Sequence, residues 1–318
     1  MGGEIRMGDP FVMKHGGRYY LYGTAGGRGF SAWTSTDLVH WEDVGQVRRH
    51  DEDSWGRGSF WAPEAFHYRG RFYLAYSAQR GRDEGFRLCL AAADSPEGPF
   101  EDVYAPWCDI GWSTIDAHVF VDDGGTPYLY FAKVGVLEPP KQGVTERTLF
   151  GKIYGMRLKE DLSAPAGEPV LCVEADQPWE ELPAEESPIN LRVECNEGAF
   201  VLKRGGRYYM TYSAGHYASP RYGIGYAVGE YPLGPWTKPD NNPLAVADPE
   251  IGVSGPGHNS ITTSPDGSEL FVVYHAHADP EHPSGQRTLN IDRLVIEGGR
   301  MRMLGPTRSP QPMPSGAD

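Results

Sequence analysis

The 318-residue chain is 39% hydrophobic and 12% aromatic, which is enough apolar material for a large core. Its net charge of −14 argues against a nucleic-acid partner, because phosphate backbones are bound by basic surfaces. No apolar run approaches the ~20 residues that span a membrane. No apolar leader follows Met1 either, so we expect a cytoplasmic protein without membrane contact. The four cysteines lack C-x-x-C spacing and are expected to be reduced thiols.

A glycine turn followed by a short aromatic strand occurs five times along the chain. The 18 tyrosines, 41 glycines and 27 prolines likewise favour strands joined by tight turns over helices. Repetition at roughly 40–60 residues is typical of a β-propeller. The sequence therefore predicts an all-β fold, a five-bladed β-propeller, from units at Gly17–Tyr22, Gly70–Tyr76, Gly125–Tyr130, Gly206–Tyr212 and Gly267–Tyr274.

A polar residue introduces the short apolar run before each of these strands. In a radially repeated fold the starts of the innermost strands meet at one mouth of the central channel. Burial of several carboxylates there for packing alone would be costly, so this point is the predicted functional site. The five residues, taken as equivalent positions of the repeat, are Asp9, Glu64, Asp116, Glu197 and His258.

The repeats extend over most of the chain and show no composition shift between them. We expect one catalytic domain over residues 1–304 and a loose, proline-rich tail over residues 305–318. The third unit carries an insertion over residues 134–188 that is rich in Glu and Pro and is expected to form loops at the rim.

The stretches around the five polar residues resemble glycoside hydrolase family 43, and the resemblance covers nearly the whole chain. Each stretch alone is a weak match, but five of them in order on successive repeats are specific. The matching stretches are Gly8-Asp9-Pro10, Ser59–Glu64 (SFWAPE), Ile115–His118 (IDAH), Glu197–Phe200 (EGAF) and Gly257–Ser260 (GHNS).

This resemblance implies three catalytic roles. Asp9 would be the general base that deprotonates the attacking water, and Glu197 the general acid that protonates the leaving oxygen. Asp116 would orient Glu197 and raise its pKa by like charge. The family inverts anomeric configuration, so the base and the acid are expected roughly 6.5–9.5 Å apart.

The resemblance also implies residues that contact the sugar. His258 would lie on the axis below the sugar and hold a water or a calcium ion; no organic cofactor is expected. Arg287 takes the place of a last-blade arginine that holds substrate. Phe60 and Trp61 are candidates for the apolar wall of the pocket.

Neighbouring acidic residues compete for two of these roles. Glu194 lies close to Glu197, but only Glu197 is followed by a glycine and a strand. Asp122 and Asp123 compete with Asp116, but they lie in a hairpin turn and are interpreted as turn formers.

Other site residues have a simpler structural alternative. Asp9 could cap a turn before a proline, and Glu64 is interpreted as structural, since the family assigns it no catalysis. A lone axial histidine such as His258 is more often a hydrogen-bonded core residue than a metal ligand. His275 and His277 share one face of a strand, so one of them could reach the pocket.

The functional prediction is an exo-acting α-L-arabinofuranosidase that removes non-reducing terminal residues from an oligosaccharide. A β-D-xylosidase, a β-D-galactofuranosidase and an endo-arabinanase remain alternatives, as does an inactive sugar-binding propeller. The sequence lacks the W-M-N-D-P motif of the retaining family 32 and the basic phosphate pocket of the family 130 phosphorylases. Oligomeric state is left open.

Overall fold

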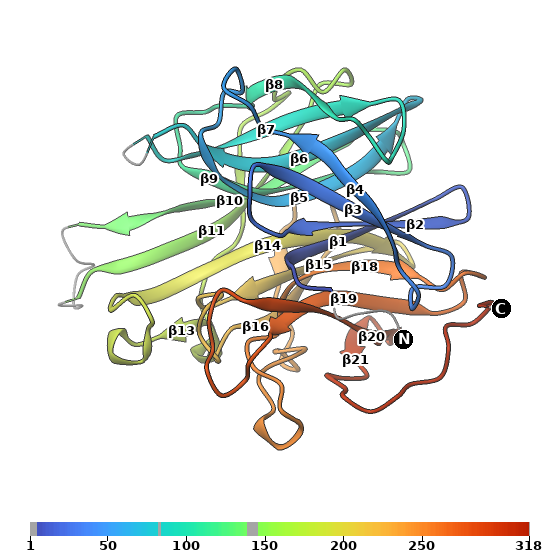
Figure 1. The fold of residues 1–318 in the computed structure, drawn as a ribbon. Coiled ribbons are helices and arrows are strands. Elements are labelled where there is room, and N and C mark those ends of the chain that lie inside the picture. Colours follow the sequence, from blue (N-terminus) through green and yellow to red (C-terminus); the bar gives the residue numbers. More distant parts are fainter. Residues whose placement is uncertain (1–4, 82–83, 139–145, 318) are drawn as a thin grey trace.

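The structure is a computed structural model that describes residues 5–81, 84–138 and 146–317. Within these ranges the chain forms twenty-one β-strands, which confirms the predicted all-β class (Figure 1). The described helices are three short 3₁₀ turns, η1 (Pro178–Glu180), η2 (Ala184–Glu186) and η3 (Pro249–Ile251). None of the described helices has the length and apolar character needed to cross a membrane.

The first two sheets each contain four antiparallel strands in sequence order. The turn between the first two strands has Gly16 and Gly17 at φ of 58° and 77°, which glycine adopts at no steric cost in a two-residue hairpin turn. The first sheet contains β1 (Gly8–His15), β2 (Arg18–Thr24), β3 (Gly29–Ser35) and β4 (Glu42–Arg49). The second contains β5 (Gly58–Tyr68), β6 (Arg71–Gln79), β7 (Phe86–Ala93) and β8 (Glu101–Trp107).

The third and fourth repeat units share one nine-stranded sheet and are not separate sheets. A short parallel ladder between β11 and β14 joins them. The third unit contributes β9 (Thr114–Val121), β10 (Pro127–Leu137), β11 (Thr148–Arg157) and β12 (Val170–Val173). The fourth unit contributes β13 (Glu181–Leu182), β14 (Arg192–Arg204), β15 (Arg207–Ala214), β16 (Gly223–Gly229) and β17 (Trp236–Thr237).

The insertion over residues 134–188 was expected to form rim loops, and in part it forms strands. β10 and β11 pair along a long hairpin that reaches from Tyr128–Arg157 to Leu137–Thr148. The pairing continues past the predicted strand end because β10 and β11 stay in register through the start of the insertion. Residues 139–145 of the insertion lie outside the described residues.

The last sheet contains β18 (Gly257–Thr263), β19 (Leu270–His277), β20 (Arg287–Glu297) and β21 (Arg300–Met303). The following segment, which the sequence suggested as a loose tail, is hydrogen-bonded to this sheet. Its contacts are Thr307 Oγ1 to Asp292 Oδ1 (2.5 Å), Arg293 Nη2 to the Met313 carbonyl (3.1 Å) and Ser315 N to Glu269 Oε2 (2.7 Å).

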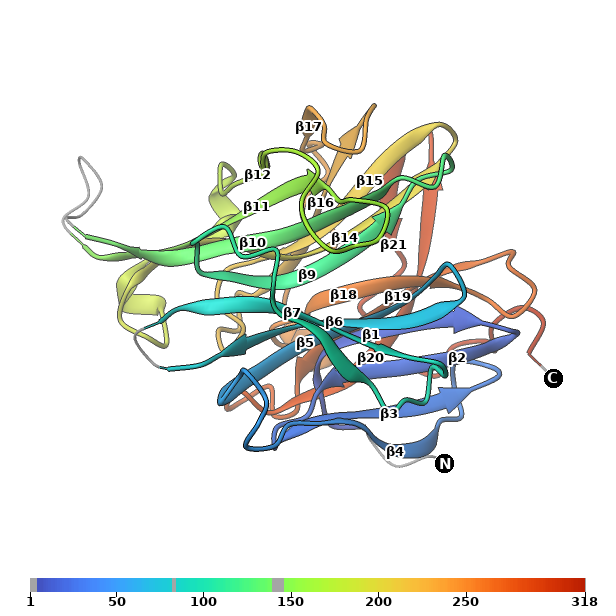
Figure 2. The same cartoon turned by 90° about the horizontal axis from the view of Figure 1, so that it is seen from above.

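The core of the described residues has five large apolar clusters, and each lies between consecutive repeat units. One cluster joins Phe271 and Val273 of the last sheet to Tyr19 and Leu21 of the first. Figure 2 shows β1 and β2 beside β18 and β19, far apart in the sequence. The repeated tyrosines are fully buried in these clusters, at Tyr22, Tyr76, Tyr130, Tyr212 and Tyr274.

Candidate active site

The first strand of each repeat unit has a β-bulge near its start. The second residue of each bulge has a left-handed backbone, with φ of 52° at Asp9, 47° at Ala62, 60° at Asp116, 61° at Gly198 and 44° at His258. Bulges of this kind redirect side chains, and non-glycine residues at positive φ are concentrated at functional sites.

The bulges correct the expected equivalence of the five polar residues. Asp9, Asp116 and His258 take the left-handed position, whereas Glu197 precedes it by one residue and Glu64 follows it by two. The prediction of five equivalent positions is therefore wrong for the two glutamates. Sequence spacing alone does not show where within a bulge each side chain lies.

The amide of each left-handed residue donates to a side chain of the preceding unit, and the cycle closes between the last unit and the first. A buried amide without an acceptor costs about 1–3 kcal/mol, so the cycle also fixes the strand starts relative to one another. The five bonds are Ala62 N to Thr24 Oγ1 (2.8 Å), Asp116 N to Ser77 Oγ (2.9 Å), Gly198 N to Asp116 Oδ2 (3.2 Å), His258 N to Ser213 Oγ (2.7 Å) and Asp9 N to His275 Nδ1 (3.0 Å).

A pocket of about 280 Å³ opens at these strand starts. All three predicted catalytic residues line it, together with His258 and Arg287. The remaining lining residues are mostly apolar or aromatic, namely Trp61, Phe86, Ile115, Val134, Leu149, Cys195, Gly215, His216 and Tyr217. The structure thus brings together the carboxyl groups of Asp9, Asp116 and Glu197, although Asp9 and Glu197 are 188 residues apart in the sequence.

Asp9 is held as a carboxylate. Its Oδ1 accepts a hydrogen bond from Arg287 Nη1 at 2.8 Å and lies 3.4 Å from His258 Nδ1. Burial alone would raise the pKa of Asp9, but the positive charges of Arg287 and His258 outweigh it and hold this pKa well below its usual range. Asp9 is therefore ionised at neutral pH, the state that a general base requires.

The pKa values of Asp116 and Glu197 are shifted in the opposite direction, upward. Burial raises the pKa of Asp116 to about 8; the charge of His258 opposes this rise, and the charge of Glu197 adds to it. Burial also raises the pKa of Glu197, although a hydrogen bond from Tyr222 opposes the shift. Neighbouring acids titrate as a pair, so Asp116 and Glu197 together keep a proton near neutral pH. One carboxylate and one proton-bearing pair thus face the same pocket.

His258 lies between the two aspartates. Its Nδ1 is 3.4 Å from Asp9 Oδ1 and 3.9 Å from Asp116 Oδ2. Burial lowers the pKa of His258, but the charges of Asp9 and Asp116 outweigh it and raise this pKa above its usual value. Gly198 packs against the ring so closely that a Cβ there would lie 3.1 Å from Nδ1.

Tyr222 is a functional candidate that the sequence did not single out. Its hydroxyl donates to Glu197 Oε1 at 2.8 Å, and its ring stacks on His275 with 5.7 Å between centroids. Gly257 leaves room for that ring, since a Cβ there would lie 2.0 Å from it. The sequence alone does not reveal that Gly257 faces the tyrosine, because the two residues meet only in the fold.

His275 proves to be the one of the two alternating histidines that contacts a catalytic residue. Its Nδ1 accepts the Asp9 amide proton, and burial, with Arg287 adding to it, lowers its pKa well below the usual value. His275 is therefore neutral and carries its proton on Nε2. His277 instead contacts Ser254 Oγ at 2.9 Å and the Tyr217 carbonyl at 2.8 Å, outside the set of pocket-lining residues.

The predicted sugar-contacting residues are divided between the pocket and its surroundings. Arg287 and Trp61 line the pocket, and the Trp61 ring lies 4.7 Å from that of Phe86. Phe60 does not line it; its ring stacks on His50 at 3.5 Å and faces a separate small cavity. Consecutive residues of a strand point to opposite faces, which is why only one of this pair reaches the pocket.

Glu64 has a structural environment, as interpreted from the sequence. Its Oε2 lies 2.7 Å from His118 Nδ1, and His118 Nε2 accepts the Val201 amide at 3.0 Å. Since Nε2 is the acceptor, the Nδ1 proton is donated to Glu64. The glutamate does not line the pocket.

The residues described here do not form a ready metal site. No group of three or more His, Cys, Asp or Glu side chains within residues 5–81, 84–138 and 146–317 could hold a metal ion. Next to His258, Asp9 Oδ1 and Asp116 Oδ2 already accept bonds from Arg287 and Gly198. The calcium ion suggested for this position stays a prediction. All four cysteines are free thiols, as expected.

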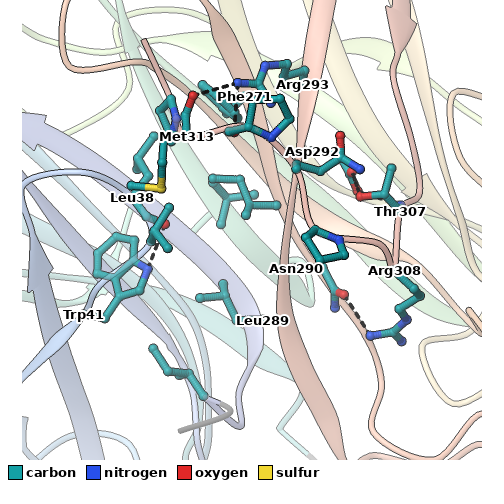
Figure 3. A pocket seen from close by; sticks show the side chains of 18 of the residues that line it. Leu38, Trp41, Phe271, Leu289, Asn290, Asp292, Arg293, Thr307, Arg308 and Met313 are labelled. Carbon is teal, nitrogen blue, oxygen red and sulfur yellow. Dashed lines mark hydrogen bonds between the residues drawn. The ribbon is translucent and has the colours of Figure 1, made fainter. Parts of the chain in front are cut away.

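A larger cavity, of about 910 Å³, lies away from the carboxyl groups (Figure 3). It is bounded by Leu38 and Trp41 of the first unit, by β20 and by the C-terminal segment. Its polar groups are bonded to one another, for example Arg308 Nη1 to Asn290 Oδ1 at 3.3 Å. Of the two carboxyl residues among its described lining residues, Asp292 accepts hydrogen bonds from the hydroxyls of Tyr274 and Thr307, and Asp43 accepts one from the Gly45 amide.

An ionised carboxylate facing a proton-bearing carboxyl pair across a pocket is the arrangement that glycoside hydrolysis requires of an acid–base site. The sequence profile described as glycosyl hydrolases family 43 matches residues 4–300. The chain belongs to this family, which confirms the resemblance inferred from its motifs.

Known relatives cover most of the chain. A crystal structure of a thermostable family-43 glycoside hydrolase is 48% identical, with a TM-score of 0.89 over 99% of this chain and 98% of that one. A β-xylosidase of Xylanibacter ruminicola is 30% identical and covers 80% of this chain and 77% of its own length. A β-D-galactofuranosidase of Aspergillus niger is 26% identical and covers 91% of this chain and 79% of its own length.

Proposed function

We propose that the protein is an inverting exo-glycosidase that removes terminal furanosyl or pentopyranosyl residues, with α-L-arabinofuranosides as its preferred substrates. The observation that carries this proposal is the contrast between Asp9, whose pKa is held low, and the Asp116–Glu197 pair, whose pKa values are raised in the same pocket.

In this mechanism Asp9 accepts a proton from a water molecule as that water attacks the anomeric carbon. Glu197 donates its proton to the glycosidic oxygen as the bond from that oxygen to the anomeric carbon breaks. The two acids share one proton, and while Asp116 carries the negative charge of the pair it keeps that proton on Glu197 until the leaving oxygen needs it. Trp61 offers an apolar face for the sugar ring, and the Arg287 guanidinium can bind its hydroxyl groups.

The preference for a furanoside is supported by the relatives and by sugar chemistry. α-L-Arabinofuranose has the same ring configuration as β-D-galactofuranose, on which a matched relative is named to act, and lacks one exocyclic carbon. Another relative is named a β-xylosidase, so β-D-xylosides are the second candidate substrate. The small pocket with apolar walls favours a terminal residue over an internal one.

The five-bladed propeller is also part of this proposal. Although the third and fourth units share a sheet, β1 contacts β5 and β18, β9 contacts β5 and β14, and β14 contacts β18. This cycle of strand contacts, together with the five core clusters and the closed cycle of bulge hydrogen bonds, supports a radial arrangement around the pocket.

Initial rates on a panel of nitrophenyl glycosides test the function. The panel contains the α-L-arabinofuranoside, β-D-xylopyranoside, β-D-galactofuranoside and β-D-fructofuranoside, each with and without a chelator. We expect the arabinofuranoside to be hydrolysed fastest. No hydrolysis of any of them would favour a sugar-binding protein or an endo-acting enzyme, and loss of rate with the chelator would support a cation at His258.

A further inference from the structure

The third repeat unit differs from the others at one position of the bulge cycle. In the other four units the residue that pairs with the first bulge residue carries a hydrogen-bond acceptor, at Thr24, Ser77, Ser213 and His275. In the third unit that residue is Ala132, which is 1% exposed and pairs with the residue before Asp116.

Because Ala132 has no side-chain acceptor, the bulge amide of the fourth unit, Gly198 N, bonds to a different group. The Gly198 amide, which would meet a side chain at position 132, donates instead to Asp116 Oδ2 at 3.2 Å. That amide directly follows Glu197. The hydrogen bond therefore ties the Asp116 carboxyl to the backbone that carries Glu197.

We propose that Ala132 is a positioning residue: by offering no acceptor, it leaves the Gly198 amide to Asp116 and so fixes the Asp116 carboxyl beside Glu197. The proposal rests on the function given above, in which these two residues form the acid pair. A serine at this position would be able to compete, because Ser77 and Ser213 reach the corresponding amides at 2.9 and 2.7 Å.

The bond has a chemical consequence for the pair. A hydrogen bond donated to a carboxylate favours its ionised form, so the Gly198 amide helps to keep negative charge on Asp116. The other groups whose charges act on Asp116 are His258, Glu197, Asp9 and Glu64. With the amide removed, Asp116 would hold its own proton more tightly, and Glu197 would lose its proton at lower pH.

The first test compares Ala132→Ser with Ala132→Cys, which is similar in shape but a poor acceptor. For Ala132→Ser we expect kcat/KM to fall about tenfold or more, the effect of losing one hydrogen bond to a charged group, with the alkaline limb of the pH profile moved to lower pH. Ala132→Cys should resemble the wild type. An unchanged profile for Ala132→Ser, or an equal loss for Ala132→Cys, would overturn the proposal.

The second test does not depend on activity. Asp116→Ala leaves the Gly198 amide without its acceptor, and adding Ala132→Ser should supply a new one. We expect the double variant to melt about 2–4 °C above Asp116→Ala alone, whereas Asp116→Ala with Ala132→Cys should gain nothing. If Ala132→Ser brings no gain, the hydroxyl does not reach Gly198 and the proposal is wrong. A wild type that hydrolyses no glycoside would refute the proposed function and leave this result standing.

Discussion

Glu64 on the one hand, and Asp116 with Glu197 on the other, are acidic residues near the start of the first strand of their repeat units, but their environments differ. Glu64, in the second unit, accepts a hydrogen bond from His118 Nδ1, and the other ring nitrogen of His118 accepts a backbone amide. Asp116 and Glu197, in the third and fourth units, contact an amide, a hydroxyl and a thiol, and they line a pocket.

The difference teaches that pairing, and not burial alone, distinguishes Glu64 from the two acids that we propose to be catalytic. Glu64 has a dedicated histidine partner and faces no substrate, whereas Asp116 and Glu197 share His258 and each other's charge. Substitution of Glu64 should therefore reduce stability, whereas substitution of Glu197 should reduce catalysis.

Loss of the acid at Glu197 should have the largest effect. Glu197→Gln keeps the shape and removes the transferable proton, so we expect kcat to fall about 10²–10⁴-fold on an oligosaccharide, whose leaving oxygen must be protonated. The melting temperature should stay near that of the wild type. Glu194→Gln is the matched control on the same strand, because Glu194 pairs with Arg192 and does not line the pocket. Normal activity of Glu197→Gln would refute the acid assignment.

Removal of Glu64, the acid paired with His118, should affect stability instead of catalysis. Glu64→Ala leaves the buried His118 without its acceptor, which we expect to cost about 3 kcal/mol in the free energy of unfolding, measured by denaturant titration. The kcat/KM of the folded fraction should change little. Glu64→Gln retains an oxygen acceptor and should lose less. A Glu64→Ala variant with normal stability but impaired turnover would reverse the comparison.

The charge beside Asp9 should set the acid limb of the pH profile. Arg287 lowers the pKa of Asp9, so Arg287→Met should raise this pKa and make kcat/KM decline at a higher pH than in the wild type as the solution is acidified. Arg287→Lys, which keeps the charge, should shift the limb less. An acid limb that is unmoved in Arg287→Met would show that Asp9 is not the group that titrates there.

Removal of the Tyr222 hydroxyl, which donates a hydrogen bond to Glu197, should have the smallest effect. Tyr222→Phe removes a bond that lowers the pKa of Glu197, so the alkaline limb should move to higher pH, while kcat falls about tenfold or less. Tyr217→Phe is a control at the same pocket, since Tyr217 lies beneath Arg287 and no hydroxyl bond to Glu197 involves it. A limb that moves to lower pH would contradict this account.

The sequence predicted the repeats and the carboxyl groups well because both have local signatures. The Gly-led aromatic strands identify the units, and Asp9, Asp116 and Glu197 stand in short motifs that match the family. The all-β class and the family are confirmed, whereas the roles of the individual residues stay predictions.

The rest depends on contacts that no local pattern encodes. The ladder that joins β11 to β14 and the bulge position of each polar residue are set by strand register. Tyr222 reaches Glu197 only because Gly257, in the next unit, leaves room for its ring. Phe60 and Trp61 looked alike in sequence, but strand alternation places one of them outside the pocket.

The central claim is that Asp9 activates a water on the side of the sugar opposite to the bond protonated by Glu197. It is tested most directly by following the anomer that is released first, by ¹H NMR, from the best nitrophenyl glycoside. The account predicts the inverted sugar, such as β-L-arabinofuranose from the α-L-arabinofuranoside, before mutarotation mixes the anomers. Initial release of the sugar with retained configuration would contradict it.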